Sequence, residues 1–163
     1  MGLRVEFLIR RLNEEGAALL AQLAGFADAA WPQPVYPAET PWTIHGILAH
    51  LVSAEGYLQL MIADILDGGP GAPPGVDIDA INATEVAALT RFTPAELIEK
   101  LAAARAKTVE MVVGFTEADL DRRGHHPVLG DISLDDFVKL IYRHDKMHMR
   151  DVQRAQSAVG MGK

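Results

Sequence analysis

Residues 133–155, SLDDFVKLIYRHDKMHMRDVQRA, carry the pattern that decides the fold. Apolar side chains recur in this stretch at steps of three and four residues, which is the spacing of one face of an α-helix. That stripe consists of Phe137, Leu140, Ile141, His144, His148, Val152 and Ala155. Two histidines therefore take positions that point toward a helical core. The pattern predicts a long last helix that ends near residue 158.

Three further amphipathic stretches precede this helix. The spacing predicts long helices over residues 3–28, 43–67 and 93–114, and a short helix over 77–89. Thr43 is placed to cap the second helix, and Thr93, Pro94 and Glu96 form a capping box with proline at the first helical position. No stretch of useful length alternates as a β-strand does. We expect an all-α protein built as a four-helix bundle.

The chain of 163 residues is expected to form a single domain over residues 1–163. The connections after the second and third long helices are each long enough to run the length of a bundle. Neighbouring helices need not be antiparallel, so the periodicity alone leaves the topology open.

Composition limits the possible metal ligands and the possible partners. The absence of cysteine excludes disulfides and thiolate metal ligands, and leaves histidine and carboxylate as metal ligands. The formal net charge of -7 opposes a general role in nucleic-acid binding. The N-terminal residues lack the apolar run of a signal peptide, and no run approaches the length of a membrane span. We expect a cytoplasmic protein without nucleic-acid or membrane partners.

A third histidine lies on a comparable stripe of the second helix. That stripe consists of Ile47, His50, Ala54, Tyr57 and Met61. Residues four apart share one side of a helix, so His144 and His148 can bind one ion while His50 completes the site from a facing helix. Each histidine taken alone fits a core residue hydrogen-bonded to a carbonyl or hydroxyl better than it fits a metal ligand. Together they favour a divalent metal, because burying an unpaired imidazole costs about 1–3 kcal/mol.

Two other metal sites are disfavoured. A di-iron bundle needs carboxylates from several helices and two Glu-x-x-His pairs, which the sequence lacks. A His-Glu-x-x-His protease needs glutamate after the first histidine, whereas Asp145 follows His144. Three nitrogen ligands around zinc leave one position open, as in catalytic sites.

Several short motifs in order along the chain resemble the DinB/YfiT superfamily of metal-dependent enzymes. They are Trp42-Thr43 leading to His50-Leu51, His126-Pro127 with Gly130 before the last helix, and Arg143-His144-Asp145-Lys146-Met147-His148. The resemblance implies an up-down-down-up four-helix bundle, frequently a homodimer, with a divalent metal held by His50, His144 and His148. It also implies either a transferase or isomerase that uses a low-molecular-weight thiol, such as mycothiol or bacillithiol, or a metal-dependent hydrolase.

Further residues are candidates for the site. Asp151 stands where many relatives have glutamine. It either orients a ligand histidine from outside the coordination sphere or approaches the metal itself, or else it pairs with Arg150 or Arg154 on the surface. Glu55 either acts as a general base or is a carboxylate satisfied by a nearby indole, hydroxyl or arginine.

Substrate contacts are expected from Tyr57, on the stripe of His50, and from Arg143, which has the charge to attract a carboxylate or an anionic thiol. The alternatives are a packing role for Tyr57 and a solvated surface position for Arg143. His125 and His126 fit a turn-stabilising role better than a place at the mouth of the site.

The leading hypothesis is a metalloenzyme, with zinc or nickel as the expected ion, that activates water or a thiol toward a small-molecule substrate. The reaction would be the transfer of a thiol to the substrate or the hydrolysis of the substrate. The rival hypothesis is a non-catalytic dimeric bundle for ligand binding or stress response, with a structural metal or none.

Overall fold

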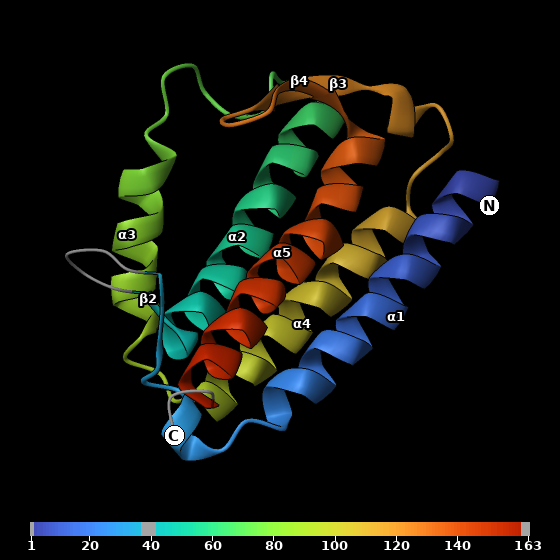
Figure 1. The fold of residues 1–163 in the computed structure, drawn as a ribbon. Helices are drawn as coiled ribbons and strands as arrows, with labels where there is room; N and C mark the ends of the chain where they lie inside the picture. The colour runs from blue at the N-terminus through green and yellow to red at the C-terminus, as the bar shows by residue number, and fades with distance from the viewer. Residues whose placement is uncertain (1, 37–41, 161–163) are drawn as a thin grey trace.

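The computed structural model describes residues 2–36 and 42–160, without the side chains of residues 159 and 160. The predicted four-helix bundle is confirmed (Figure 1). Its long helices are α1 (Leu3–Ala24), α2 (Ile44–Leu66), α4 (Pro94–Val113) and α5 (Leu134–Gly160). The short helix α3 (Ile78–Leu89) packs against α2. The first helix ends earlier than expected, at Ala24, because Gly25 is followed by a short 3₁₀ turn over Asp28–Ala30.

The helices follow the up-down-down-up order that the resemblance implies. Helices α1 and α2 each pack against both α4 and α5, so the two pairs occupy opposite diagonals of the bundle. Figure 1 shows α1 and α5 running in one direction and α2 and α4 in the other. Of the two long connections, only the one after α2 crosses the bundle, with α3 descending outside α2. The connection after α4 stays at one end.

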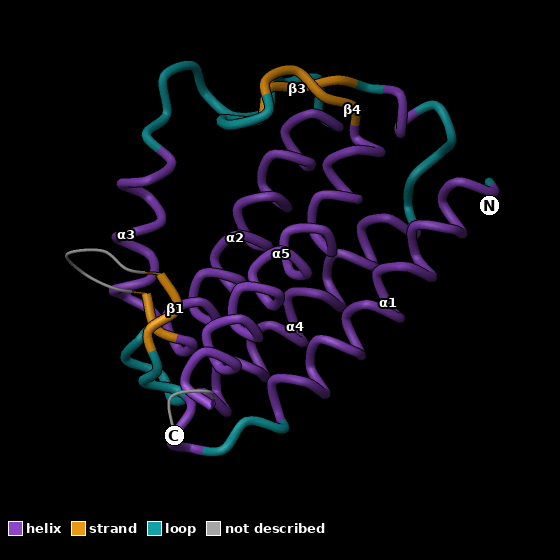
Figure 2. The backbone as a smooth tube through the Cα atoms, viewed as in Figure 1, coloured by secondary structure: helices purple, strands orange, loops and turns teal. Residues whose placement is uncertain are grey.

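Two short hairpins were not predicted (Figure 2). Strands β1 (Pro34–Tyr36) and β2 (Trp42–Thr43) pair beside the start of α2, and β3 (Arg123–His126) and β4 (Gly130–Ser133) pair over the end where α5 begins. The strands have two to four residues, which is too few to produce a recognisable alternation.

The end hairpin is fixed to the loop that follows α2. The His125 N–H donates to the Pro70 carbonyl over 2.6 Å, and the Ala72 N–H donates to the His125 carbonyl over 2.9 Å. Gly71 between them has φ +88°, and a Cβ there would lie 2.7 Å from the His125 carbonyl oxygen. Only glycine fits this close approach.

The predicted helix starts are confirmed. Thr43 caps α2 by accepting from the Gly46 N–H over 3.1 Å. Thr93 and Glu96 form both hydrogen bonds of the capping box at the start of α4. These caps fix where each helix begins, and hence which residues face the interior.

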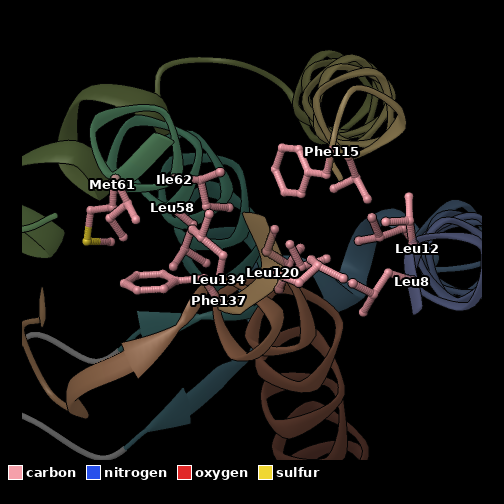
Figure 3. Packing of buried hydrophobic residues seen from close by; sticks show 14 of the residues in the cluster. Leu8, Leu12, Leu58, Met61, Ile62, Phe115, Leu120, Leu134 and Phe137 are labelled. Carbon is pink, nitrogen blue, oxygen red and sulfur yellow. The ribbon is translucent and has the colours of Figure 1, made fainter. Parts of the chain in front are cut away.

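The bundle interior contains two apolar clusters separated by a polar layer. Figure 3 shows the first cluster, whose labelled residues are Leu8, Leu12, Leu58, Met61, Ile62, Phe115, Leu120, Leu134 and Phe137. The second cluster includes Leu23, Ile47, Leu101 and Val152. Every long helix contributes to the polar layer or faces it, through Gly16, Glu55, Arg105 and Asp145 respectively.

Helix α2 is long and apolar enough to cross a membrane by length and composition alone. Most of its apolar stretch is buried inside the bundle, as in the core helix of a soluble protein.

Candidate metal centre

The three predicted histidines converge. His144 Nε2 lies 3.1 Å from His50 Nε2 and 3.0 Å from His148 Nε2. His50 comes from α2 and the other two from successive turns of α5, as the sequence predicts. Among the described residues, this is the one group of three or more histidine, aspartate and glutamate side chains whose ligand atoms meet.

The three nitrogens fit a divalent metal ion. Ligands 2.0–2.1 Å from zinc in a tetrahedral site lie about 3.3 Å from one another, close to the separations found between these nitrogens. Nitrogens so close together need either a shared proton or a cation between them. His50 is 5% exposed and His148 is 6% exposed, whereas His144 is partly exposed.

Burial keeps the imidazoles neutral. Loss of hydration, aided by the neighbouring rings, lowers the pKa of His50 to about 4 and the pKa of His144 to about 3. Burial also lowers the pKa of His148, while Asp151 acts in the opposite direction. At neutral pH each ring therefore has a nitrogen lone pair to offer a metal, which is the form that coordination requires.

Tyr36 on β1 joins the cluster from outside. Its hydroxyl lies 2.8 Å from His148 Nδ1 and donates to Asp151 Oδ2 over 2.8 Å. Asp151 also accepts from Arg154 over 3.1 Å. Asp151 therefore pairs with Arg154 and also reaches His148 through the Tyr36 hydroxyl.

The family is decided by the sequence itself. The sequence model of the DinB superfamily matches residues 11–152, a range that includes all three histidines. The chain belongs to the DinB superfamily. No functionally curated protein sequence matches the chain.

Solved structures share the fold of this DinB protein at low identity. YfiT from Bacillus subtilis, a probable metal-dependent hydrolase with an unusual four-helix bundle topology, is 17% identical with a TM-score of 0.74, over 98% of this chain and 90% of YfiT. A mycothiol-dependent maleylpyruvate isomerase is 14% identical with a TM-score of 0.74. That alignment covers 93% of this chain but 63% of the isomerase.

A third structure bears on the predicted absence of nucleic-acid partners. The colibactin self-resistance protein ClbS, solved in complex with double-stranded DNA, is 12% identical with a TM-score of 0.69, over 94% of each chain. Since a protein of the same fold is found with DNA, the fold itself does not exclude such a partner.

Glu55 lies in the polar layer, away from solvent. One carboxylate oxygen accepts from Arg105 Nε over 2.8 Å and from the Thr108 hydroxyl over 2.7 Å, and the other accepts from Arg105 Nη2 over 3.2 Å. Arg105 Nη2 also donates to Asp145 Oδ2 over 2.6 Å. Of the alternatives for Glu55, the structure shows the carboxylate satisfied by an arginine and a hydroxyl.

Tyr57 and Arg143, the two residues expected to contact substrate, lie away from the three histidines. Tyr57 is partly buried against the first apolar cluster, about two turns along α2 from His50. Arg143 is exposed and lines a groove between α1 and α5. The described hydrogen bonds and ring contacts connect neither residue to the histidines. His126 accepts from the Val128 and Leu129 N–H groups, which is the turn-stabilising role expected for it.

Sequence reasoning missed Tyr36, Arg105 and the contact of Trp42 with His50. The Trp42 and His50 rings lie 4.9 Å apart, and His50 Nδ1 is buried without a hydrogen-bond partner among the described residues. Arg105 gave one signal, because it lies four residues from Leu101 on the buried face of its helix. Tyr36 gave none, since it lies in a proline-rich stretch without periodicity.

Proposed function

We propose that this protein is a divalent-metal-dependent enzyme in which His50, His144 and His148 hold zinc or nickel. The observation that carries the proposal is the convergence of three Nε2 atoms in a mostly apolar interior. An ion there would supply a Lewis acid that makes a water molecule or a thiol nucleophilic at neutral pH. A site with three histidine ligands leaves a position free for that purpose.

The reaction we propose is transfer of a low-molecular-weight thiol to a small electrophile, or hydrolysis of a small substrate. Two proteins of the same fold support these classes: the mycothiol-dependent isomerase the first, and YfiT the second. Partial exposure of His144 supports access of a small molecule to the cluster.

The chain's own residues supply binding and positioning. Burial keeps the three histidines neutral at pH 7, so that each can offer a nitrogen lone pair to the same ion. The Trp42 ring packs against the His50 ring, with 4.9 Å between their centroids, and His50 is buried. Glu55 we assign to positioning rather than proton transfer, because donors occupy both of its oxygens. Tyr57 and Arg143 stay proposed substrate contacts. A cytoplasmic location and a homodimer also stay proposals.

A turnover assay tests the proposal. Zinc- or nickel-loaded protein is incubated with a chromogenic electrophile plus mycothiol or bacillithiol, and separately with chromogenic esters, with and without chelator. We expect turnover that chelator abolishes and that His148→Ala lacks. Equal rates for the native protein and His148→Ala, or rates unaffected by chelator, would contradict the proposal of a metal-dependent enzyme.

Docking on double-stranded DNA is a second candidate, supported by ClbS and by one surface feature. A groove of about 580 Å³ between α1 and α5 is rich in cationic side chains. They are Arg10, Arg11, Lys139, Arg143 and Lys146. We rank it second because Glu15 pairs with Arg11 and Lys146, Asp135 pairs with Lys139, and the net charge is -7.

The DNA candidate has its own test. Fluorescence anisotropy with a labelled duplex should show affinity that falls as salt rises and that weakens when Arg10 and Arg143 are both replaced by glutamate. No binding at low salt would exclude DNA binding and would not affect the proposal of a metal-dependent enzyme.

A further inference from the structure

We infer that Tyr36 and Asp151 fix the tautomer of His148, so that its Nε2 lone pair faces the other two histidines. The inference rests on the proposed metal site and gives Tyr36 a role that the sequence does not suggest. Tyr36 is a positioning residue, since its hydroxyl touches a ligand histidine and not the ion.

The direction of the hydrogen bonds follows from the chemistry of the three groups. An ionised carboxylate only accepts, so the hydroxyl hydrogen of Tyr36 points to Asp151 Oδ2, 2.8 Å away. The hydroxyl oxygen then faces His148 Nδ1 over 2.8 Å with its lone pairs. A neutral imidazole has one N–H, and this arrangement places it on Nδ1. Nε2 of His148 is left unprotonated, as metal binding requires.

The surroundings hold this chain of hydrogen bonds in place. The Tyr36 ring meets the His148 ring edge-on at 6.0 Å and lies 6.4 Å from the Trp42 ring. Arg154 donates to the other carboxylate oxygen of Asp151, which orients that group. Tyr36 thus has packing contacts on its ring and polar contacts at its hydroxyl.

The hairpin also connects the two helices that carry the ligands. The chain just before β1 is bound to the start of α2, because the Ile44 N–H donates to the Gln33 carbonyl and the His45 N–H to the Trp31 carbonyl, each over 3.0 Å. Strand β1 packs against α5. Tyr36 is therefore held by the helix of His50 while it orients a histidine of α5.

Removing the hydroxyl tests the inference. Tyr36→Phe keeps the ring, and we expect zinc affinity, measured by competition with a chromophoric chelator, to fall about 10- to 100-fold. The matched control is Tyr142→Phe, which removes a tyrosine hydroxyl far from Asp151 and should bind zinc as the native protein does. Native affinity in Tyr36→Phe would overturn the inference.

A second measurement does not depend on metal binding. The ¹⁵N chemical shifts of His148 in the metal-free protein should show the Nδ1–H tautomer, and Tyr36→Phe should shift the ring toward Nε2–H or a mixture. Asp151→Asn, whose amide both donates and accepts, should also give a mixture. An Nε2–H tautomer in the native protein would overturn the inference. If native protein binds no metal but shows Nδ1–H, the proposed function fails while the assignment of Tyr36 stands.

Discussion

Arg105 Nη2 donates to Asp145 Oδ2 over 2.6 Å in the interior of the bundle. The same guanidinium donates to Glu55, so one side chain of α4 connects α2, five residues after His50, with α5, next to His144. The polar layer thus contains two acidic side chains, Glu55 and Asp145, for one cation, Arg105. Burial accordingly raises the pKa of Asp145 to about 6 despite the arginine. The polar layer thus joins the two helices that carry the three histidines.

Loss of the cation should be costly. We predict that Arg105→Met lowers the free energy of unfolding of the metal-free protein by about 3–5 kcal/mol, because two buried acids lose their partner. Urea denaturation measures the change. Arg154→Met, which breaks an exposed pair, should cost less than about 1 kcal/mol. Equal effects of the two substitutions would show that the layer contributes no more than a surface pair.

Gly16 leaves the space that Arg105 occupies. A Cβ at Gly16 would lie 2.9 Å from Arg105 Nη1 and 3.0 Å from its Cγ. Gly16→Ala should therefore destabilise the protein by about 1–3 kcal/mol through overpacking. A Cβ at Gly56 on α2 meets nothing within 4 Å, so Gly56→Ala should stabilise by about 0.5–1 kcal/mol through helix propensity. Thermal unfolding of both variants compares these opposite signs.

Acid should destabilise the metal-free protein. The folded-state pKa values of His50 and His144 lie below the usual 6.5, so the unfolded chain binds more protons and stability falls as pH falls below about 6.5. Asp145 acts oppositely: its raised pKa favours the folded state at low pH, and this contribution is lost as pH rises through about 6.

Two histidines outweigh one aspartate in this balance. We predict a net loss of about 2–4 kcal/mol between pH 7 and pH 5, taking about 1.4 kcal/mol for each pKa unit. Urea denaturation across this range measures it, and His144→Gln should flatten the slope. Stability that rises from pH 7 to pH 5 would mean that the histidines are not held neutral.

Metal should stabilise the folded protein. Binding to the folded state alone adds about 2.7 kcal/mol at a free ion concentration 100 times the dissociation constant. We therefore expect zinc or nickel to raise the unfolding midpoint of native protein and to leave His144→Ala unchanged. A similar rise in that variant would locate the ion elsewhere.

The sequence allowed prediction of those features that repeat along a helix. The stripes containing His50, His144 and His148, and the capping box at Thr93, follow from local spacing and are present in the structure. The placement of Tyr36 and the pairing of Arg105 with Glu55 and Asp145 depend on segments far apart in the chain, which periodicity does not relate. The substrate contacts expected of Tyr57 and Arg143 stay predictions, because sharing a helix with a histidine does not fix the height or the face of a neighbouring residue.

Metal content tests the central claim most directly. Native protein and His148→Ala are purified without an affinity tag, equilibrated with zinc or nickel, freed of unbound ion and analysed for metal per chain. The account predicts one ion per native chain and almost none in His148→Ala, with both proteins folded by circular dichroism. Native protein without metal, or full occupancy in His148→Ala, would contradict the three-histidine site.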